Sequence, residues 1–194
     1  MSDTVIQDQH AGSSYVPGEP GLWWVVFWEL TVYSLLIFGV AHYKSVSPEM
    51  VGASQSLLDQ NLGLINTILL LTGSLFVALG VSDCRAGKWQ AAKRWFRLAF
   101  VSGVVFGIDK YIEYSSKFAH DITPLTNEFF ASYFILTAFH MLHVVVASIL
   151  LLFMARYSTP QAGPAKFKFI EGSACFWHMV DVIWVILYFV LYLL

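Results

Sequence analysis

The chain has 194 residues, of which 57% are hydrophobic, 16% are aromatic and 12% are charged, and its formal net charge is −2. A soluble domain contains about 25% charged residues, so this composition indicates a membrane protein. No basic run is present, and we therefore expect no nucleic-acid partner. The two cysteines have no metal-binding spacing, and the sequence contains neither a C-x-x-C-H haem-attachment motif nor a glycine-rich phosphate loop.

We expect an all-α protein whose residues 21–194 form a single domain, an integral membrane bundle of five transmembrane helices. About 20 helical residues cross the hydrocarbon core of a bilayer. Five segments meet this requirement, near residues 21–43, 61–82, 95–114, 129–154 and 172–194. Residues 1–20 are polar, rich in small residues and end in Pro-Gly-Glu-Pro, and we interpret them as a mostly disordered or surface-lying arm.

The first of these helices combines interfacial anchors with a buried carboxylate. Trp23, Trp24 and Trp28 lie near its start, where tryptophan is enriched at the membrane surface. Glu29 lies about 12 Å from that start at 1.5 Å per residue. A charged group at such a depth costs about 2.5–3.5 kcal/mol on insertion scales, so Glu29 is expected to face protein or water.

The three middle helices carry polar residues at helical spacing. Asn66 is expected to face other helices, and Gly73 to allow close approach of a neighbouring backbone. Lys110 and Glu113 are three residues apart and can pair on one helix face. We interpret them as a positioning pair near a membrane surface, worth about 0–1 kcal/mol. His140 and His143 are likewise three apart, near mid-membrane.

The last helix has a polar stripe along one side. Glu171, His178 and Asp181 follow one another at spacings of seven and three, which places them on nearly one face. Counted along their helices, Glu29, His143, His178 and Asp181 share one layer of the membrane. We expect these four side chains to form one buried polar network.

Such a layer admits functional interpretations as well as a structural one. A proton relay, a metal site or a bis-histidine haem would use the same residue types. A haem between helices needs small residues that open a pocket, whereas Phe139, Phe176 and Trp177 crowd these positions. We therefore favour a structural network that fixes helix packing, with no catalytic residue and no metal site.

Loop charges predict the orientation of the chain. With five crossings, the N-terminus and the loops 83–94 and 155–170 share one side of the membrane. Counting Arg97 with its adjoining loop, that side holds eight of the 11 Lys and Arg residues, and the other side holds Lys44 and Lys117. Basic residues gather on the cytoplasmic side. The N-terminus is therefore expected to be cytoplasmic and the C-terminus periplasmic, in the inner membrane of a bacterium.

Several stretches within residues 17–194 resemble, in the right order, the cytochrome c oxidase subunit III family, and in particular its short NorE-type members, which lack two N-terminal helices. They read PGEPGLWWVVFWEL, NLGLINTILLL, FGIDKYIEY, TNEFFASYFILTAFHMLHVVVA and EGSACFWHMVDVIW. Glu29 matches the carbodiimide-reactive glutamate of longer members, although Trp28 precedes it where small residues are common. The other matching motif residues are Asn66, Lys110, Glu113, His140, Glu171 and Trp184.

The resemblance implies an accessory subunit and no enzyme. Subunit III carries no redox centre, so haem and iron or copper are expected in a catalytic membrane partner. The main hypothesis is a NorE-type partner of nitric oxide reductase that supports assembly, stability or activity. The alternatives are subunit III of an oxygen-reducing cytochrome c oxidase, with Glu29 near the proton entry path, and a free-standing transporter or haem protein.

Phospholipid is the one ligand that the resemblance implies for the chain itself, in a cleft between the helices. Lys88, Arg94 and Arg97 are candidate contacts for a lipid headgroup. Basic residues at these positions also follow from the ordinary enrichment of Lys and Arg on the cytoplasmic side, which is the interpretation that we favour.

Overall fold

The computed structural model describes residues 20–161 and 163–194. The expected N-terminal arm therefore lies outside the described residues, except for Pro20. The described residues form six α-helices and a terminal π-helical turn: α1 (Pro20–Val46), α2 (Pro48–Gln55), α3 (Gln60–Arg85), α4 (Trp89–Ala119), α5 (Glu128–Tyr157), α6 (Pro164–Tyr188) and η1 (Phe189–Leu193). Within the described ranges the fold is all-helical, as the sequence predicts.

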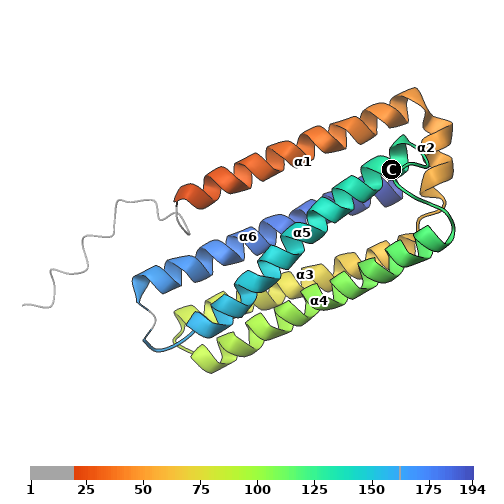
Figure 1. Ribbon diagram of the computed structural model, residues 1–194. Helices are drawn as coiled ribbons and strands as arrows, with labels where there is room; N and C mark the ends of the chain where they lie inside the picture. Colours follow the sequence, from red (N-terminus) through yellow and green to blue (C-terminus); the bar gives the residue numbers. More distant parts are fainter. Residues whose placement is uncertain (1–19, 162) are drawn as a thin grey trace, which may run out of the picture.

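The five long helices run side by side, and each is antiparallel to the next along the chain (Figure 1). Helices α3, α4, α5 and α6 pack closely, while α1 lies along α5 and α6. The short α2 crosses the end of the bundle at which the chain also terminates. Helix α6 contacts α1, α3 and α5, and α5 contacts α1, α4 and α6, so these two helices connect the others.

Four of the described helices are long and apolar enough to cross a membrane: α1, α3, α5 and α6 together with η1. Helix α4 has 31 residues and lies in the same bundle, but it carries Asp109, Lys110, Glu113 and Lys117 in its second half. Its composition alone therefore does not identify it as a span. The chain is an integral membrane helical bundle, and its fifth crossing stays a prediction.

The helix boundaries differ from the expected ones in three places. Helix α6 begins at Pro164, eight residues before the predicted start at 172. Helix α4 extends beyond the predicted range 95–114 at both ends. At its start Lys93 and Arg94 can reach water from within the helix, and at its end Lys117 pairs with Glu113.

Residues 44–60, which lie between the first two predicted helices, contain α2. Pro48 occupies the first turn of α2, where its fixed φ and missing N–H are tolerated, and Val51 and Ser54 are buried against the bundle.

Local signals fix where the helices start and how they turn. The carboxylate of Asp59 accepts hydrogen bonds from the backbone N–H groups of Asn61 and Leu62 and so caps α3. The side chain of Asn127 accepts one from Phe130 N and caps α5. In the tight turn between α3 and α4, Gly87 has a φ of 72°, a left-handed value that glycine adopts without steric cost.

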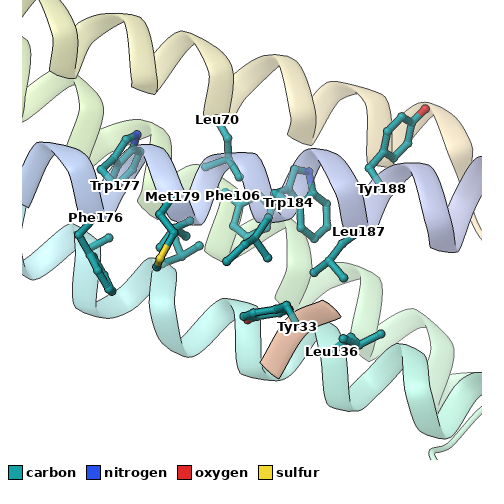
Figure 2. Close-up of a cluster of buried hydrophobic side chains, with 14 of the residues drawn as sticks. Tyr33, Leu70, Phe106, Leu136, Phe176, Trp177, Met179, Trp184, Leu187 and Tyr188 are labelled. Atoms are coloured by element: carbon teal, nitrogen blue, oxygen red, sulfur yellow. The ribbon is translucent and has the colours of Figure 1, made fainter. Parts of the chain in front are cut away.

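Aromatic side chains fill the core between the helices (Figure 2). Trp184 of α6 lies edge-on to Phe106 of α4, with ring centroids 4.8 Å apart. Leu70 of α3 approaches the same region. A Cβ atom at Gly73 would collide with Ser102 of α4 and contact Trp177 of α6. The prediction that Gly73 permits a close helix approach is therefore confirmed.

Candidate functional site

The first polar contact in the bundle joins α1 to α5. His143 Nε2 lies 3.2 Å from Glu29 Oε2, and the two side chains are 10% and 15% exposed. His143 Nδ1 lies 2.8 Å from the carbonyl oxygen of Phe139, to which it donates a hydrogen bond. Because that bond uses the Nδ1 proton, the contact with Glu29 is attractive when a further proton lies between Nε2 and Oε2.

The second contact joins α3 to α6 and centres on Ser74. The Ser74 hydroxyl lies 2.6 Å from His178 Nδ1. Asp181 is 5% exposed, and its Oδ1 atom has no hydrogen-bond partner among the described residues. His178 is half-buried, at the border between the bundle and its surroundings.

The structure thus pairs Glu29 with His143, and it links His178 with Ser74. Within the described part of the chain, no hydrogen bond or ion pair connects the two groups. Each group fastens one pair of helices, α1 to α5 and α3 to α6. That all four residues act as one network stays a prediction.

A larger polar cluster surrounds Lys110, which is 2% exposed. Its Nζ donates to Glu113 Oε2 at 2.7 Å and to the Tyr192 hydroxyl at 2.8 Å. Glu113 Oε1 in turn accepts from Tyr133 at 2.6 Å and from Tyr192 at 3.0 Å. Lys117 Nζ lies 3.7 Å from the same Oε1 atom. The cluster joins α4, α5 and η1.

This burial corrects the interpretation of Lys110 and Glu113 as a pair near the membrane surface. Both side chains are enclosed in protein, and Lys110 Nζ also lies 4.7 Å from the centre of the Trp184 ring. A buried pair differs from a surface pair because removal of one partner leaves an uncompensated charge, which costs about 3–5 kcal/mol.

The remaining motif residues also face other helices. The Asn66 amide donates a short hydrogen bond to Asp109 across the α3–α4 contact. The indole N–H of Trp184 donates to Thr67 Oγ1 at 3.2 Å. Glu171, 3% exposed, accepts from Arg85 Nη2 at 2.7 Å.

His140 is completely buried on α5, between aromatic rings. Its ring centroid lies 5.1 Å from that of Trp184 and 5.7 Å from that of Phe106. Neither ring nitrogen has a hydrogen-bond partner among the described residues. The aromatic rings occupy the space that a ligand of this imidazole would need.

Sequence reasoning missed several members of these clusters. Tyr133 and Tyr192 lie in apolar, aromatic-rich helices, where a tyrosine with a buried partner has no distinguishing spacing. Lys117 was recognisable, because it follows Glu113 by four residues on the same helix face. Gly73 was predicted to allow a close helix approach, but the role of its neighbour Ser74, whose hydroxyl connects α3 to α6, was missed.

The candidate headgroup residues line two surface cavities at the basic end of the bundle. Lys88 and Arg94 line one of about 520 Å³, beside Pro160. Arg97 lines another of about 510 Å³, together with Lys93 and Arg156. Among the described residues, no group of three His, Cys, Asp or Glu side chains is placed to hold a metal ion.

Long apolar helices fastened to one another by buried polar contacts define a polytopic helical membrane protein. The family model for cytochrome c oxidase subunit III matches residues 21–194. The chain belongs to this family.

Individual relatives agree with the family match. The chain is 26% identical to cytochrome c oxidase subunit 3 of Synechocystis, over 94% of this chain and 83% of that protein. It is 29% identical to the Corynebacterium diphtheriae protein of the same name, over 66% of this chain and 63% of the relative. The Heterololigo bleekeri protein of that name is also 29% identical, over 80% of this chain and 62% of that protein. The chain thus spans less than two thirds of the length of some of these relatives.

Proposed function

We propose that this chain is a non-catalytic membrane subunit of a haem-copper complex, and that it supports the assembly, stability or activity of a catalytic subunit. The family match over residues 21–194 carries this proposal. The interior of the bundle agrees with it, because Lys110, Glu113 and Tyr192 bind one another across helices. Side chains engaged in this way hold helices together and leave the chemistry to the partner.

The main form of the proposal is a NorE-type partner of nitric oxide reductase. It is supported by five long helices in one bundle and by the PGEPG and DKYIEY stretches. A second form is subunit III of an oxygen-reducing oxidase, which is favoured by the relatives named cytochrome c oxidase subunit 3. The two forms share the accessory role and differ in the gas that the partner reduces.

In both forms the haem, with iron or copper, belongs to the partner, and phospholipid is the ligand of the present chain. Anionic headgroups suit the cavity lined by Lys93, Arg97 and Arg156. We also propose that the chain lies in the cytoplasmic membrane of a bacterium with its basic end inside.

Purification of the full chain from its native membrane, by a tag and in mild detergent, tests the proposal. We expect a haem-bearing membrane subunit to co-purify, and the complex to consume either nitric oxide or oxygen. The chain separated from that subunit should show no Soret band and no stoichiometric metal. A Soret band on the separated chain would overturn the accessory role, and the gas consumed decides between the two forms.

Asp181→Ala distinguishes a structural role from a proton-carrying one. Asp181 is 5% exposed, so alanine at this position leaves a cavity in place of a buried carboxylate. We therefore expect a lower yield of the assembled complex, with near-normal turnover per haem in the complexes that form. Normal assembly combined with abolished turnover would show that this layer carries protons.

A further inference from the structure

A cavity of about 610 Å³ opens at the end of the bundle where α2 lies (Figure 1). We call it the α4-end cavity, because the last turns of α4 form one wall and the start of α3 forms another. Its polar lining consists of Asp59, Glu113, Ser116, Lys117 and His120, and the rest of its lining is Leu and Ile. Since α3 is long and apolar enough to cross a membrane, its first turn places the cavity at the level of the membrane surface.

Lys117 reaches this cavity as a buried cation that lacks a hydrogen bond. Its side chain is 7% exposed, and its Nζ lies 3.7 Å from Glu113 Oε1, which is beyond hydrogen-bonding distance. Glu113 Oε1 already accepts from Tyr133 at 2.6 Å and from Tyr192 at 3.0 Å, so both lone pairs of this oxygen are used. The three N–H bonds of the Lys117 ammonium therefore need acceptors that enter the cavity from outside.

The charges beside the cavity are also unequal. Lys110 and Lys117 are both buried, and Glu113 is the carboxylate with which both of them pair. Asp109 is half-buried and accepts a hydrogen bond from α3. Asp59 is exposed at the rim, where water screens its charge. The buried group thus carries an excess of one positive charge, and a charge removed from water is costly unless it is paired.

We propose that the α4-end cavity is a binding site for a singly charged oxyanion, which accepts hydrogen bonds from Lys117 and supplies the missing negative charge. The Ser116 hydroxyl lines the same cavity and provides a second donor. Phosphate chemistry fits these donors, because charge-assisted hydrogen bonds from lysine to phosphate oxygens are strong. The oxyanion has two possible sources, the phosphodiester of an acidic membrane lipid and inorganic phosphate in solution.

This site is separate from the cavities lined by Lys88, Arg94 and Arg97, which lie at the opposite end of α4. It does not depend on the accessory function proposed above, because it follows from the buried charges of this chain alone. Anything that binds the folded chain and not the unfolded one also stabilises it. The oxyanion is therefore expected to raise the thermal stability of the chain.

Lys117→Met in the full chain tests the site, with Lys44→Met as its matched control. Methionine is a long side chain without the ammonium. Lys44 lies in the last turn of α1, on the expected same side of the membrane, and does not line the cavity. In a titration with dioleoyl phosphatidylglycerol read by native mass spectrometry, we expect Lys117→Met to bind one lipid molecule about tenfold more weakly than wild type. Lys44→Met should bind it as wild type does.

Two further probes identify the chemistry and the source of the ligand. Dioleoylglycerol has the same chains without a phosphate, and we expect its binding to be unaffected by Lys117→Met. Inorganic phosphate carries the oxyanion without the chains, and its binding is read as a rise in the thermal stability of the chain. Binding that depends on Lys117 and is seen with phosphatidylglycerol assigns the site to a lipid headgroup. The same dependence seen with inorganic phosphate alone assigns it to a free anion.

Ile112→Trp provides a second variant that leaves every charge in place. Ile112 is exposed and lines the cavity, so an indole at this position narrows the space for the ligand. Ile149→Trp is its control, because Ile149 is equally an exposed isoleucine but lies on α5, outside the cavity. We expect Ile112→Trp to weaken binding of the phosphate probe and Ile149→Trp to leave it unchanged. Without the probe, the two variants should have the same thermal stability.

Three results would overturn the proposal. The first is equal binding of both phosphate probes by Lys117→Met and Lys44→Met. The second is binding of dioleoylglycerol as tight as that of phosphatidylglycerol, which would make the cavity a merely apolar groove. The third is no binding of either phosphate probe by wild type, in which case water alone satisfies Lys117. Each of these results leaves the accessory function standing, since co-purification with a haem-bearing subunit tests that function separately.

Discussion

At the scale of single residues, the strongest constraint is the charge of Lys110 in a protein interior. One carboxylate and one tyrosine hydroxyl satisfy it, and the same carboxylate accepts from two tyrosines. Glu113 is therefore the residue on which the largest number of buried polar atoms depends. The 3-residue spacing predicted the pair, but its tyrosine partners come from α5 and η1, which only tertiary packing brings close.

Glu113→Gln should destabilise the isolated chain strongly, because it leaves Lys110 without a counter-charge. We expect a loss of about 3–5 kcal/mol in the free energy of unfolding, measured by denaturant titration in detergent. The double variant Lys110→Met/Glu113→Gln should regain the part of that loss that Lys110 causes, whereas the buried Lys117, 3.7 Å from Glu113 Oε1, stays without its partner. Lys168→Met, at an exposed site on α6, is the control. A change within about 0.5 kcal/mol for Glu113→Gln would contradict the cluster.

At the scale of elements, α1 differs from the other spans. It is the least buried of the four candidate spans, and it lies against α5 and α6 at one side of the bundle (Figure 1). Tyr33 packs on Phe139, with ring centroids 5.6 Å apart, and Glu29 meets His143. The apolar run predicted α1 from sequence, and the depth of Glu29 predicted a protein-facing side. The partner helix was not predictable, because several helices carry polar residues at that depth.

Glu29→Ala should loosen α1 from the bundle while the remaining helices stay packed. The contact with His143 is one of few that hold α1, so its loss acts mainly on this element. Hydrogen exchange read by mass spectrometry should show faster exchange in α1 and unchanged exchange in α3 and α4. Ser34→Ala serves as the control, since the Ser34 hydroxyl bonds a carbonyl of its own helix. Equal exchange of α1 in both variants would show that the pair contributes nothing to docking.

The contact between α3 and α4 depends on Gly73. Its missing side chain admits Ser102 and Trp177. Gly73→Leu should therefore separate the two helices and cost at least about 1–3 kcal/mol of unfolding free energy, the usual range for overpacking. Gly39→Leu is the matched control, because nothing lies within 4 Å of a Cβ atom at Gly39. Equal stability of both variants would mean that the bundle can open at Gly73 without cost.

At the scale of the whole molecule, apolar runs predicted all five long helices, and the order of the polar motifs predicted the family that the family model identifies. The runs did not predict α2, since an amphipathic helix of 8 residues leaves little signal in an irregular stretch. The apolar runs also predicted a shorter α4 than the structure shows. Its basic start and its buried charges lower the apolarity of the segment, whereas the bundle satisfies those charges internally.

The membrane crossing of α4 decides the topology of the entire chain. If α4 spans the bilayer, the α3–α4 turn and the α5–α6 connection lie on one side, and the loop 120–127 lies on the other. Because basic residues lie near the α3–α4 turn and the α5–α6 connection, we expect these two connections to lie in the cytoplasm. Single cysteines at Lys88, Leu125 and Lys166, in a chain without Cys84 and Cys175, test this in intact cells. A membrane-impermeant thiol reagent should label only the cysteine at position 125 until the membrane is permeabilised. Labelling of 88 and 125 from the same side would place α4 on the membrane surface and reduce the bundle to four crossings.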